Sequence, residues 1–201
     1  MKLTYVFSGY TLWLDVLDED NSIRNVMDGM EAEHNTAHIQ RPHVTLVYGV
    51  PHTLESSLLS FRSLLPHFSS LKAKTLTPNG LICDTEIAGV NSGKMDMIWS
   101  EISLKASPAF ASARRAIESI FDVTGNEEKK DGTGREDGEE WRPHLSLAYD
   151  EPGGGTLDLK SVVRHVSKEE GIWKDVKVKG VSLWDMNGTI EEWKLIEEVV
   201  F

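Results

Sequence analysis

One nine-residue pattern occurs twice in the chain, and this repeat constrains the fold more than any other feature. The copies read RPHVTLVYG at 41–49 and RPHLSLAYD at 142–150, with Arg, Pro, His, Leu and Tyr at the same offsets. Thr45 and Ser146 each follow the shared histidine, His43 or His144, by two positions. A pattern of this length, repeated at matching places in two halves, indicates a duplicated unit.

Each copy is the middle strand of a similar series of elements. Apolar spacing predicts strand, helix, strand, helix, strand in each half. The expected strands are Tyr10–Leu17, Arg41–Val50, one or two short strands within Leu71–Cys83 interrupted by a turn at Pro78-Asn79-Gly80, Lys94–Leu104, Trp141–Tyr149, and two closing strands joined by a hairpin turn at Asn187-Gly188. The expected helices cover Ile23–His34, Leu54–Phe68, Pro108–Phe121 and Leu159–Val166, with N-caps at Asp20 or Asn21, Thr53 and Ser107.

This order of elements predicts an α+β fold built as one domain over residues 1–201. We expect two pseudo-symmetric lobes, each a mainly antiparallel sheet with its helices packed outside, and a central cleft that carries the two repeated strands. The segment 124–140 has no large apolar residue and is rich in Gly, Asp and Glu, so a mobile solvated loop is expected there. It is either a lid or, as we favour, an unselected insertion.

Charge limits the class of partner. The 21 Lys and Arg residues against 32 Asp and Glu residues give a net charge of −11. Because binding to a nucleic-acid polymer depends on basic residues that neutralise phosphates, we expect no long nucleic acid as a partner. A small phosphate-bearing ligand in a local pocket is compatible with this charge, and we expect a monomer.

The remaining composition points to an intracellular protein. Cys83 is the single cysteine, which excludes an internal disulfide and suits a reducing compartment. No apolar run is long enough for a membrane span, and the N-terminal segment lacks the features of a signal peptide. We expect no membrane association and a cytoplasmic location. Cys83 itself is better explained as a small buried hydrophobe than as a nucleophile.

Alternation along a strand points His43 and Thr45 the same way, and the same holds for His144 and Ser146. If the two strands are neighbours, two imidazoles and two hydroxyls converge on one cleft. Such a set suits hydrolysis of a cyclic phosphodiester, in which one neutral and one protonated imidazole transfer protons and the hydroxyls bind phosphate oxygens. This chemistry requires no metal and no cofactor.

Other readings of the histidines are weaker. A zinc site could be suggested by His34, His38, His43 and His52, of which His34 and His38 have i, i+4 spacing, but no HExxH pattern or cysteine cluster accompanies them. His67 and His165 have no counterpart in the other half and are interpreted as structural. Residues 153–155 are a Gly-Gly-Gly run, yet no phosphate-binding loop motif surrounds them.

The paired H-x-T and H-x-S strands resemble those of the two-histidine phosphoesterase superfamily. Within it, YTLWLDV near the N-terminus, the two repeats, and VSLWDMNGTIEEWKLIEEV near the C-terminus are similar to the eukaryotic cyclic phosphodiesterases (2′,3′-cyclic-nucleotide 3′-phosphodiesterases) associated with by-products of tRNA splicing. The resemblance spans the chain apart from 124–140.

The resemblance implies an enzyme that opens ADP-ribose 1″,2″-cyclic phosphate to ADP-ribose 1″-phosphate and nucleoside 2′,3′-cyclic phosphates to 2′-phosphates. It implies that His43 and His144 are the acid–base pair and that Thr45 and Ser146 hold the phosphate. By analogy, His144 activates water and His43 protonates the leaving oxygen. The near-symmetric motifs do not themselves separate these two roles.

Four flanking residues complete the expected site. The resemblance implies that Tyr149 lines the pocket, although alternation puts it on the face opposite His144 unless the strand bends near Pro152 and Gly153. Trp13 either stacks on a base or ribose of the substrate or packs in the core. Arg41 and Arg142 fall on the histidine face and are expected mainly in solvent.

Two rival functions stay open at this point. One is an RNA-end cyclic phosphodiesterase or RNA ligase of the same superfamily, which would need a basic groove. The other is a noncatalytic nucleotide-binding module, for which two proton-transfer groups would be superfluous.

Overall fold

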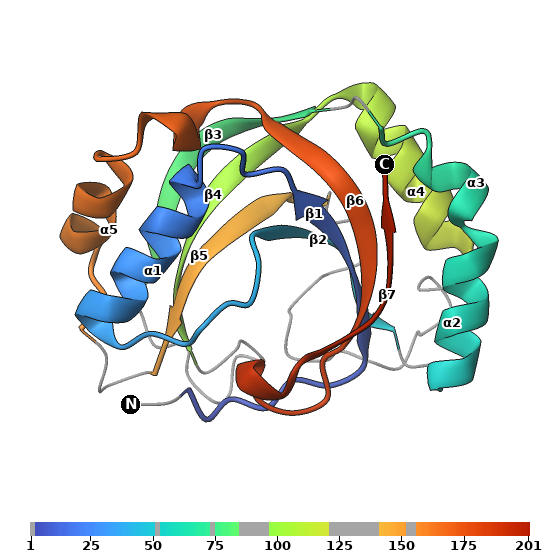
Figure 1. The fold of residues 1–201 in the computed structure, drawn as a ribbon, viewed down its shortest axis with the longest axis horizontal. Helices are drawn as coiled ribbons and strands as arrows, with labels where there is room; N and C mark the ends of the chain where they lie inside the picture. Colours follow the sequence, from blue (N-terminus) through green and yellow to red (C-terminus); the bar gives the residue numbers. More distant parts are fainter. Residues whose placement is uncertain (1–2, 51–52, 73–74, 85–96, 121–140, 152–155) are drawn as a thin grey trace.

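Seven antiparallel strands form one sheet in the part of the chain that the computed structural model describes, residues 3–50, 53–72, 75–84, 97–120, 141–151 and 156–201 (Figure 1). The strands are β1 (Tyr10–Val16), β2 (His43–Val50), β3 (Thr75–Asp84), β4 (Ile98–Ala106), β5 (His144–Asp150), β6 (Val176–Asp185) and β7 (Lys194–Val200). Together with the helices they confirm the α+β class.

The sheet closes on itself. Its order is β1-β2-β5-β4-β3-β6-β7, and β1 also pairs with β6, so that the first six strands form a ring of pairings with β7 at the side of β6. Two links of the ring are short: β2 meets β5 at Val44 and Leu145, and β3 meets β6 at two register pairs. We expected a separate sheet in each lobe; instead one sheet is continuous through these two narrow links.

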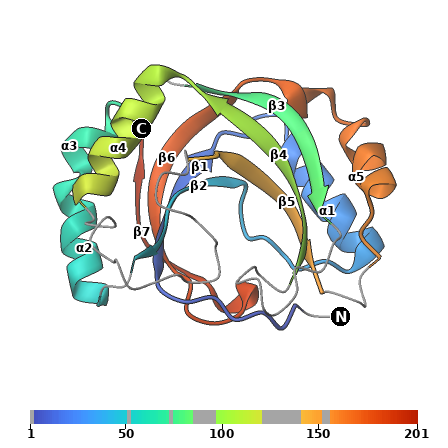
Figure 2. The same ribbon diagram turned by 180° about the vertical axis from the view of Figure 1, so that it is seen from behind.

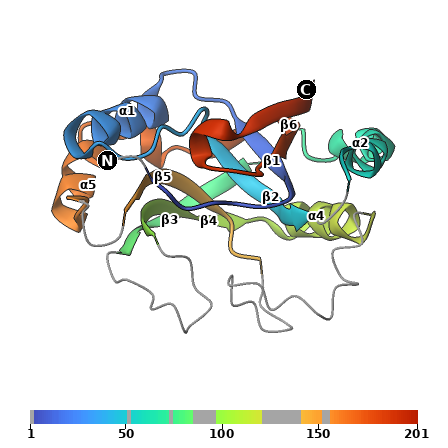
Figure 3. The ribbon, with the colours of Figure 1, turned by 90° about the horizontal axis from the view of Figure 1, so that it is seen from below.

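The helices gather at two opposite ends of the sheet (Figures 1 and 3). Helix α1 (Ser22–His34) lies beside α5 (Leu159–Val166), and these helices contact β5 and β3 respectively. The other group consists of α2 (Leu54–Ser63), α3 (Leu65–Phe68) and α4 (Pro108–Ile120), as the view from behind also shows (Figure 2). Short 3₁₀ helices, η2 (Glu170–Trp173) and η3 (Ile190–Glu192), flank β6.

Helix ends follow the sequence signals closely. The side chain of Thr53 accepts a hydrogen bond from the amide of Ser56, and the Ser107 hydroxyl accepts one from the amide of Phe110. At α1 the N-cap position is Asn21, one of the two expected residues, but its side chain makes no capping bond. The carboxylate of Asp20 accepts from the amide of Ser22, and that of Asp18 accepts from the amides of Ile23 and Arg24. A carboxylate at this position also complements the positive end of the helix dipole.

Three expected boundaries are wrong. The Pro78-Asn79-Gly80 sequence does not divide two strands but forms a register shift inside the continuous strand β3. The expected long helix over 54–68 breaks at Leu64, just before Pro66 enters the first turn of α3. The connection between β6 and β7 includes η3 rather than a tight hairpin turn, although the two strands do pair.

Two apolar clusters hold these layers together. The larger one joins buried residues of β1 to β6 to the inward faces of α1 to α5, and Ile196 and Val199 of β7 pack against it. The smaller one is aromatic and contains Trp13, Trp184, Trp193 and Phe7, with Tyr48 and Tyr149 packed against it. No helix in the described ranges has the length and apolar character needed to cross a membrane.

Candidate active site

Strand pairing brings the two repeats together. Val44 of β2 is the register partner of Leu145 of β5. In an antiparallel ladder this register sets His43 across from Ser146 and Thr45 across from His144. Because neighbouring residues of a strand point to opposite faces, these four side chains share the face opposite Val44 and Leu145. The two H-x-T/S pairs are therefore interleaved at one place in the sheet.

The repeated R-P-H sequence fixes each imidazole in the same way. Nδ1 of His43 lies 2.9 Å from the carbonyl oxygen of Arg41, and Nδ1 of His144 lies 3.2 Å from that of Arg142. A carbonyl can only accept, so Nδ1 carries the proton in both rings. Nε2 is then the nitrogen of each ring that is left for a reacting group.

His43 lies under aromatic cover. Its side chain is only 4% exposed, and the ring stacks on Trp13 with a centroid distance of 3.5 Å and an interplanar angle of 9°. Burial is the main cause that lowers the pKa of His43 to about 3; the hydrogen bond to the Arg41 carbonyl opposes it, and His144 and the Arg41 guanidinium add smaller lowering effects. His43 is consequently neutral at physiological pH.

The indole ring of Trp13 packs against one face of the His43 ring. Its ring is fully buried and also stacks on Trp184, with 4.3 Å between centroids. Of the two readings of Trp13, the structure favours core packing, because a ring with no exposed surface has no free face for a ligand. Trp13 therefore acts on the site through His43.

The surroundings of His144 are different. Its side chain is 33% exposed, and Nε2 lies 3.8 Å from a carboxylate oxygen of Glu101, which is 2% exposed. The other oxygen of Glu101 pairs with Arg142 at 3.2 Å. Arg142 is largely in solvent, as expected, but it also balances this buried charge. Glu101 was missed by the sequence reasoning because nothing in the run Ser-Glu-Ile-Ser marks it.

A β-bulge brings Tyr149 to the site. Ser146 pairs with Glu101 and Ala148 pairs with Ser100, so Leu147 is an extra residue in β5. The bulge restores Tyr149 to the face of Ser146, and its hydroxyl donates to Ser146 Oγ at 2.6 Å. The expected bend at Pro152 and Gly153 is not needed, and those two residues lie outside the described ranges. Burial raises the pKa of Tyr149 to about 12, so the hydroxyl keeps its proton.

The same bulge occurs in the first repeat. Trp13 pairs with Thr45 and Leu12 pairs with Val47, so Leu46 is the extra residue of β2. This bulge turns Tyr48 toward the Thr45 face, where it packs against the aromatic cluster around Trp13. Tyr48 stands at the repeat position of Tyr149, and that offset is the signal from which it could have been found.

Arg41 contradicts the expectation of a solvent-exposed side chain. Its guanidinium pairs with Glu198 at 2.9 Å and with the buried Asp15 at 3.4 Å, and it lies 5.1 Å above the ring of Trp184. Burial raises the pKa of Asp15, against the opposing effect of Arg41. These contacts hold Arg41 in the packing of β1, β6 and β7 and away from a role as a free phosphate anchor.

Other candidate residues lie elsewhere. Cys83 is on β3, partly buried against the apolar core. His38 follows the end of α1 and pairs with Glu31 rather than with His34. The expected loop over 124–140 and the glycines at 153–155 fall outside the described residues.

No family model matches the sequence, and no curated protein matches it significantly.

Proposed function

We propose that the chain is a metal-independent cyclic phosphodiesterase that uses His43 and His144 as its acid–base pair. One observation carries the proposal: the register of Val44 with Leu145 interleaves the two H-x-T/S pairs on one face of the sheet. Two imidazoles with free Nε2 atoms and two hydroxyls are the groups that in-line displacement at a cyclic phosphate needs.

A pseudo-twofold arrangement of two lobes supports the same reading. Exchanging β1 with β4, β2 with β5 and β3 with β6 leaves the ring of strand pairings unchanged. Small details repeat as well: the carbonyls of Pro42 and Pro143 accept from the amides of Val16 and Leu104, and both middle strands carry a bulge. We infer two related lobes, with the substrate cleft where β2 meets β5.

The environments of the two rings favour His43 as the general base and His144 as the general acid. This is the opposite of the assignment that the resemblance implies. His43 is neutral, so its Nε2 can take a proton from water. A bound phosphate anion works against the effect of burial and makes this ring more basic in the complex. The side chain of His144 is 33% exposed, and its Nε2 lies 3.8 Å from a carboxylate oxygen of Glu101. With His43 as the base, His144 is the imidazole that remains to protonate the leaving oxygen.

The hydroxyl groups of Ser146 and Thr45 are placed to donate hydrogen bonds to phosphate oxygens. Because Tyr149 donates to Ser146 Oγ, the hydrogen of Ser146 is free to point to a different acceptor. Thr45 occupies the equivalent position next to His43. The two hydroxyls would stabilise the negative charge that develops on the nonbridging oxygens in the transition state.

Substrate size follows from the site and the charge. Nucleoside 2′,3′-cyclic phosphates and ADP-ribose 1″,2″-cyclic phosphate are monoanionic at the reacting phosphate and fit a local site in an acidic protein. The RNA-end enzyme is less favoured, because Arg41 and Arg142, which precede the two histidines by two positions, are paired with carboxylates. A binding module would not require two free Nε2 atoms.

The test is a turnover assay in EDTA with three substrates: a nucleoside 2′,3′-cyclic phosphate, ADP-ribose 1″,2″-cyclic phosphate, and an RNA ending in a cyclic phosphate. We expect turnover of the small substrates, and losses of roughly 10²- to 10⁴-fold in His43→Ala and His144→Ala. His67→Ala is the matched control, since His67 is exposed on α3. Turnover of RNA alone would favour the RNA-end enzyme, and binding without turnover would favour the binding module.

A substrate with sulfur in place of the leaving oxygen separates the two histidines. Sulfur leaves without protonation, so the variant that lacks the general acid recovers much of its rate. We expect this recovery in His144→Ala and not in His43→Ala. Recovery confined to His43→Ala would instead support the assignment that the resemblance implies.

A further inference from the structure

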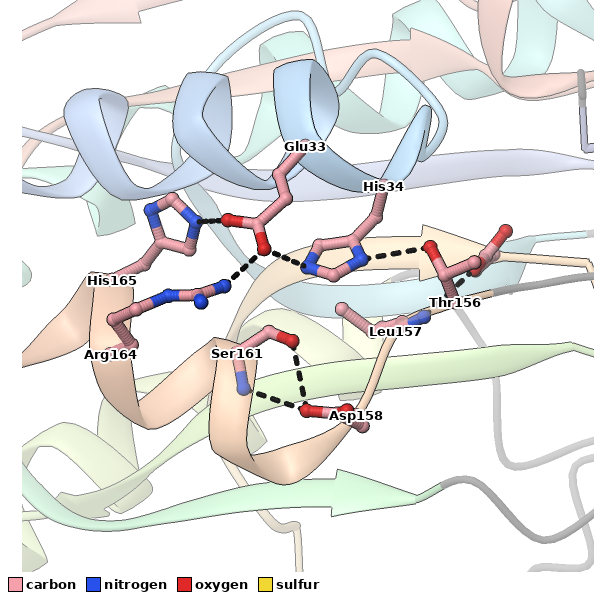
Figure 4. A network of polar contacts seen from close by, with 9 residues as sticks. Glu33, His34, Thr156, Leu157, Asp158, Ser161, Arg164 and His165 are labelled. Carbon is pink, nitrogen blue, oxygen red and sulfur yellow. Dashed lines mark hydrogen bonds and ion pairs between the residues drawn. The ribbon is translucent and has the colours of Figure 1, made fainter.

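A second cluster of ionisable groups joins helices α1 and α5, at the end of the molecule where these helices lie together (Figure 1). Glu33 and His34 stand in the last turn of α1, and His165 stands in α5. One carboxylate oxygen of Glu33 and one ring nitrogen of each histidine all lie within 4.8 Å of one another. Figure 4 shows the carboxylate of Glu33 between the rings of His165 and His34.

One buried nitrogen of this cluster, Nε2 of His34, makes no hydrogen bond within the described ranges. The side chain that carries it is 6% exposed. This nitrogen faces an oxygen of Glu33 at 3.7 Å, which is too far for a hydrogen bond. The opposite nitrogen, Nδ1, is 2.9 Å from Thr156 Oγ1. If Nδ1–H donates to this oxygen, a buried lone pair on Nε2 faces a carboxylate.

We propose that Glu33, His34 and His165 form a zinc site that clamps α1 to α5. Zinc bonds of about 2.0–2.1 Å in a tetrahedron put ligand atoms about 3.3 Å apart. Glu33 faces the two rings with different oxygens, Oε2 at 2.8 Å from His165 Nε2 and Oε1 at 3.7 Å from His34 Nε2, and each distance lies within about 0.5 Å of this spacing. Two imidazoles and one carboxylate are a donor set that zinc favours, with the fourth position left to water.

Thr156 and Gly29 support the ligands, whereas the cation of Arg164 opposes a bound metal ion. Thr156 orients His34, which is how a second hydrogen bond commonly fixes a metal-binding imidazole. Arg164 pairs with the oxygen of Glu33 that faces His34. Gly29 leaves room for His165, since a Cβ at this position would lie 2.6 Å from His165 Nδ1. The alternative to a zinc ion is a proton shared between these side chains. The positive charge of Arg164 favours this alternative, because it repels a divalent ion more strongly than a proton.

The first test is a calorimetric titration of the chelator-treated full-length protein with ZnCl₂. We expect one zinc ion per chain, with affinity lowered at least tenfold in both His34→Ala and His165→Ala, and roughly 10- to 100-fold in Thr156→Val. His38→Ala is the matched control, because His38 lies close by in sequence and contacts Glu31 instead. Titration with CoCl₂ should give the visible absorption of a tetrahedral ion in the wild type and not in His34→Ala.

Arg164→Gln keeps the proposal testable if the histidine variants do not fold. Removing a cation beside Glu33 should raise zinc affinity at least threefold, whereas a plain ion-pair cluster would show no zinc binding at all. Absence of saturable binding to the wild type would overturn the proposal, as would binding that His34→Ala and His165→Ala leave unchanged. Zinc binding and the EDTA turnover assay report separately, so either proposal can fail without the other.

Discussion

Replacing His43 with Asn should remove a specific pH dependence from the stability of the protein. Asn can still donate to the carbonyl of Arg41, as Nδ1 of His43 does at 2.9 Å, so local packing is largely kept. What the substitution removes is a buried group whose pKa, at about 3, lies below the ordinary value of a histidine. The wild type and the variant therefore differ in one titration.

The sign and size follow from proton linkage. An unfolded chain with a histidine pKa near 6.5 binds more protons than the folded chain between about pH 6.5 and pH 3. The contribution of neutral His43 to stability is thus complete above pH 6.5 and is lost as the pH falls toward 3. Each pH unit inside this window costs up to about 1.4 kcal/mol, so the loss between pH 7.5 and pH 5 is about 2 kcal/mol.

Urea denaturation of the wild type and His43→Asn at pH 7.5, 6 and 5 measures this difference. Carboxylates such as Asp15 titrate in both proteins and cancel in the comparison. His67→Asn is the control: His67 is exposed on α3, so this variant leaves His43 and its neighbours unchanged and should keep the pH dependence of the wild type. Parallel stability curves for the wild type and His43→Asn from pH 7.5 to pH 5 would refute the argument that His43 is held neutral by burial.

Three further outcomes are expected. Tyr149→Phe removes the hydroxyl that donates to Ser146 Oγ, and kcat/KM for a nucleoside 2′,3′-cyclic phosphate should fall roughly tenfold with the fold intact; an unchanged value would show that Ser146 needs no orientation. Glu101→Gln removes a buried negative charge beside His144, which should weaken the repulsion of the dianionic 2′-phosphate product. Product-inhibition kinetics should therefore show inhibition that is roughly 3- to 10-fold stronger, and unchanged inhibition would show that Glu101 is not near the bound phosphate. Gly29→Ala forces a methyl group against His165 and should lower the free energy of unfolding by about 1–3 kcal/mol in urea titrations, and a loss near zero would mean that α5 moves aside freely.

The sequence predicted the parts of this protein that depend on local pattern. Alternation along β2 and β5 gives the shared face of His43 with Thr45 and of His144 with Ser146, and the structure adds the register that interleaves them. Helix caps at Thr53 and Ser107 likewise depend on residues close in sequence.

The parts that were missed depend on contacts distant in sequence. A bulge at Leu147 is invisible in a run of apolar residues, yet it decides which face Tyr149 occupies. Glu101 meets His144 only because β4 pairs with β5, and Arg41 leaves solvent only because β6 and β7 bring Trp184 and Glu198 to it. Strand patterns do not specify which strand pairs with which, so one continuous sheet could not be told from two.

The position of β1 between β2 and β6 has a consequence for synthesis of the protein. Strand β1 can pair with β2 soon after synthesis. Its second partner is β6, which carries Trp184 and is synthesised about 170 residues later. At ordinary translation rates that interval is on the order of ten seconds. Throughout it the nascent chain exposes an unpaired apolar strand edge and an incompletely covered Trp13, which is the period in which a chaperone would have most to protect.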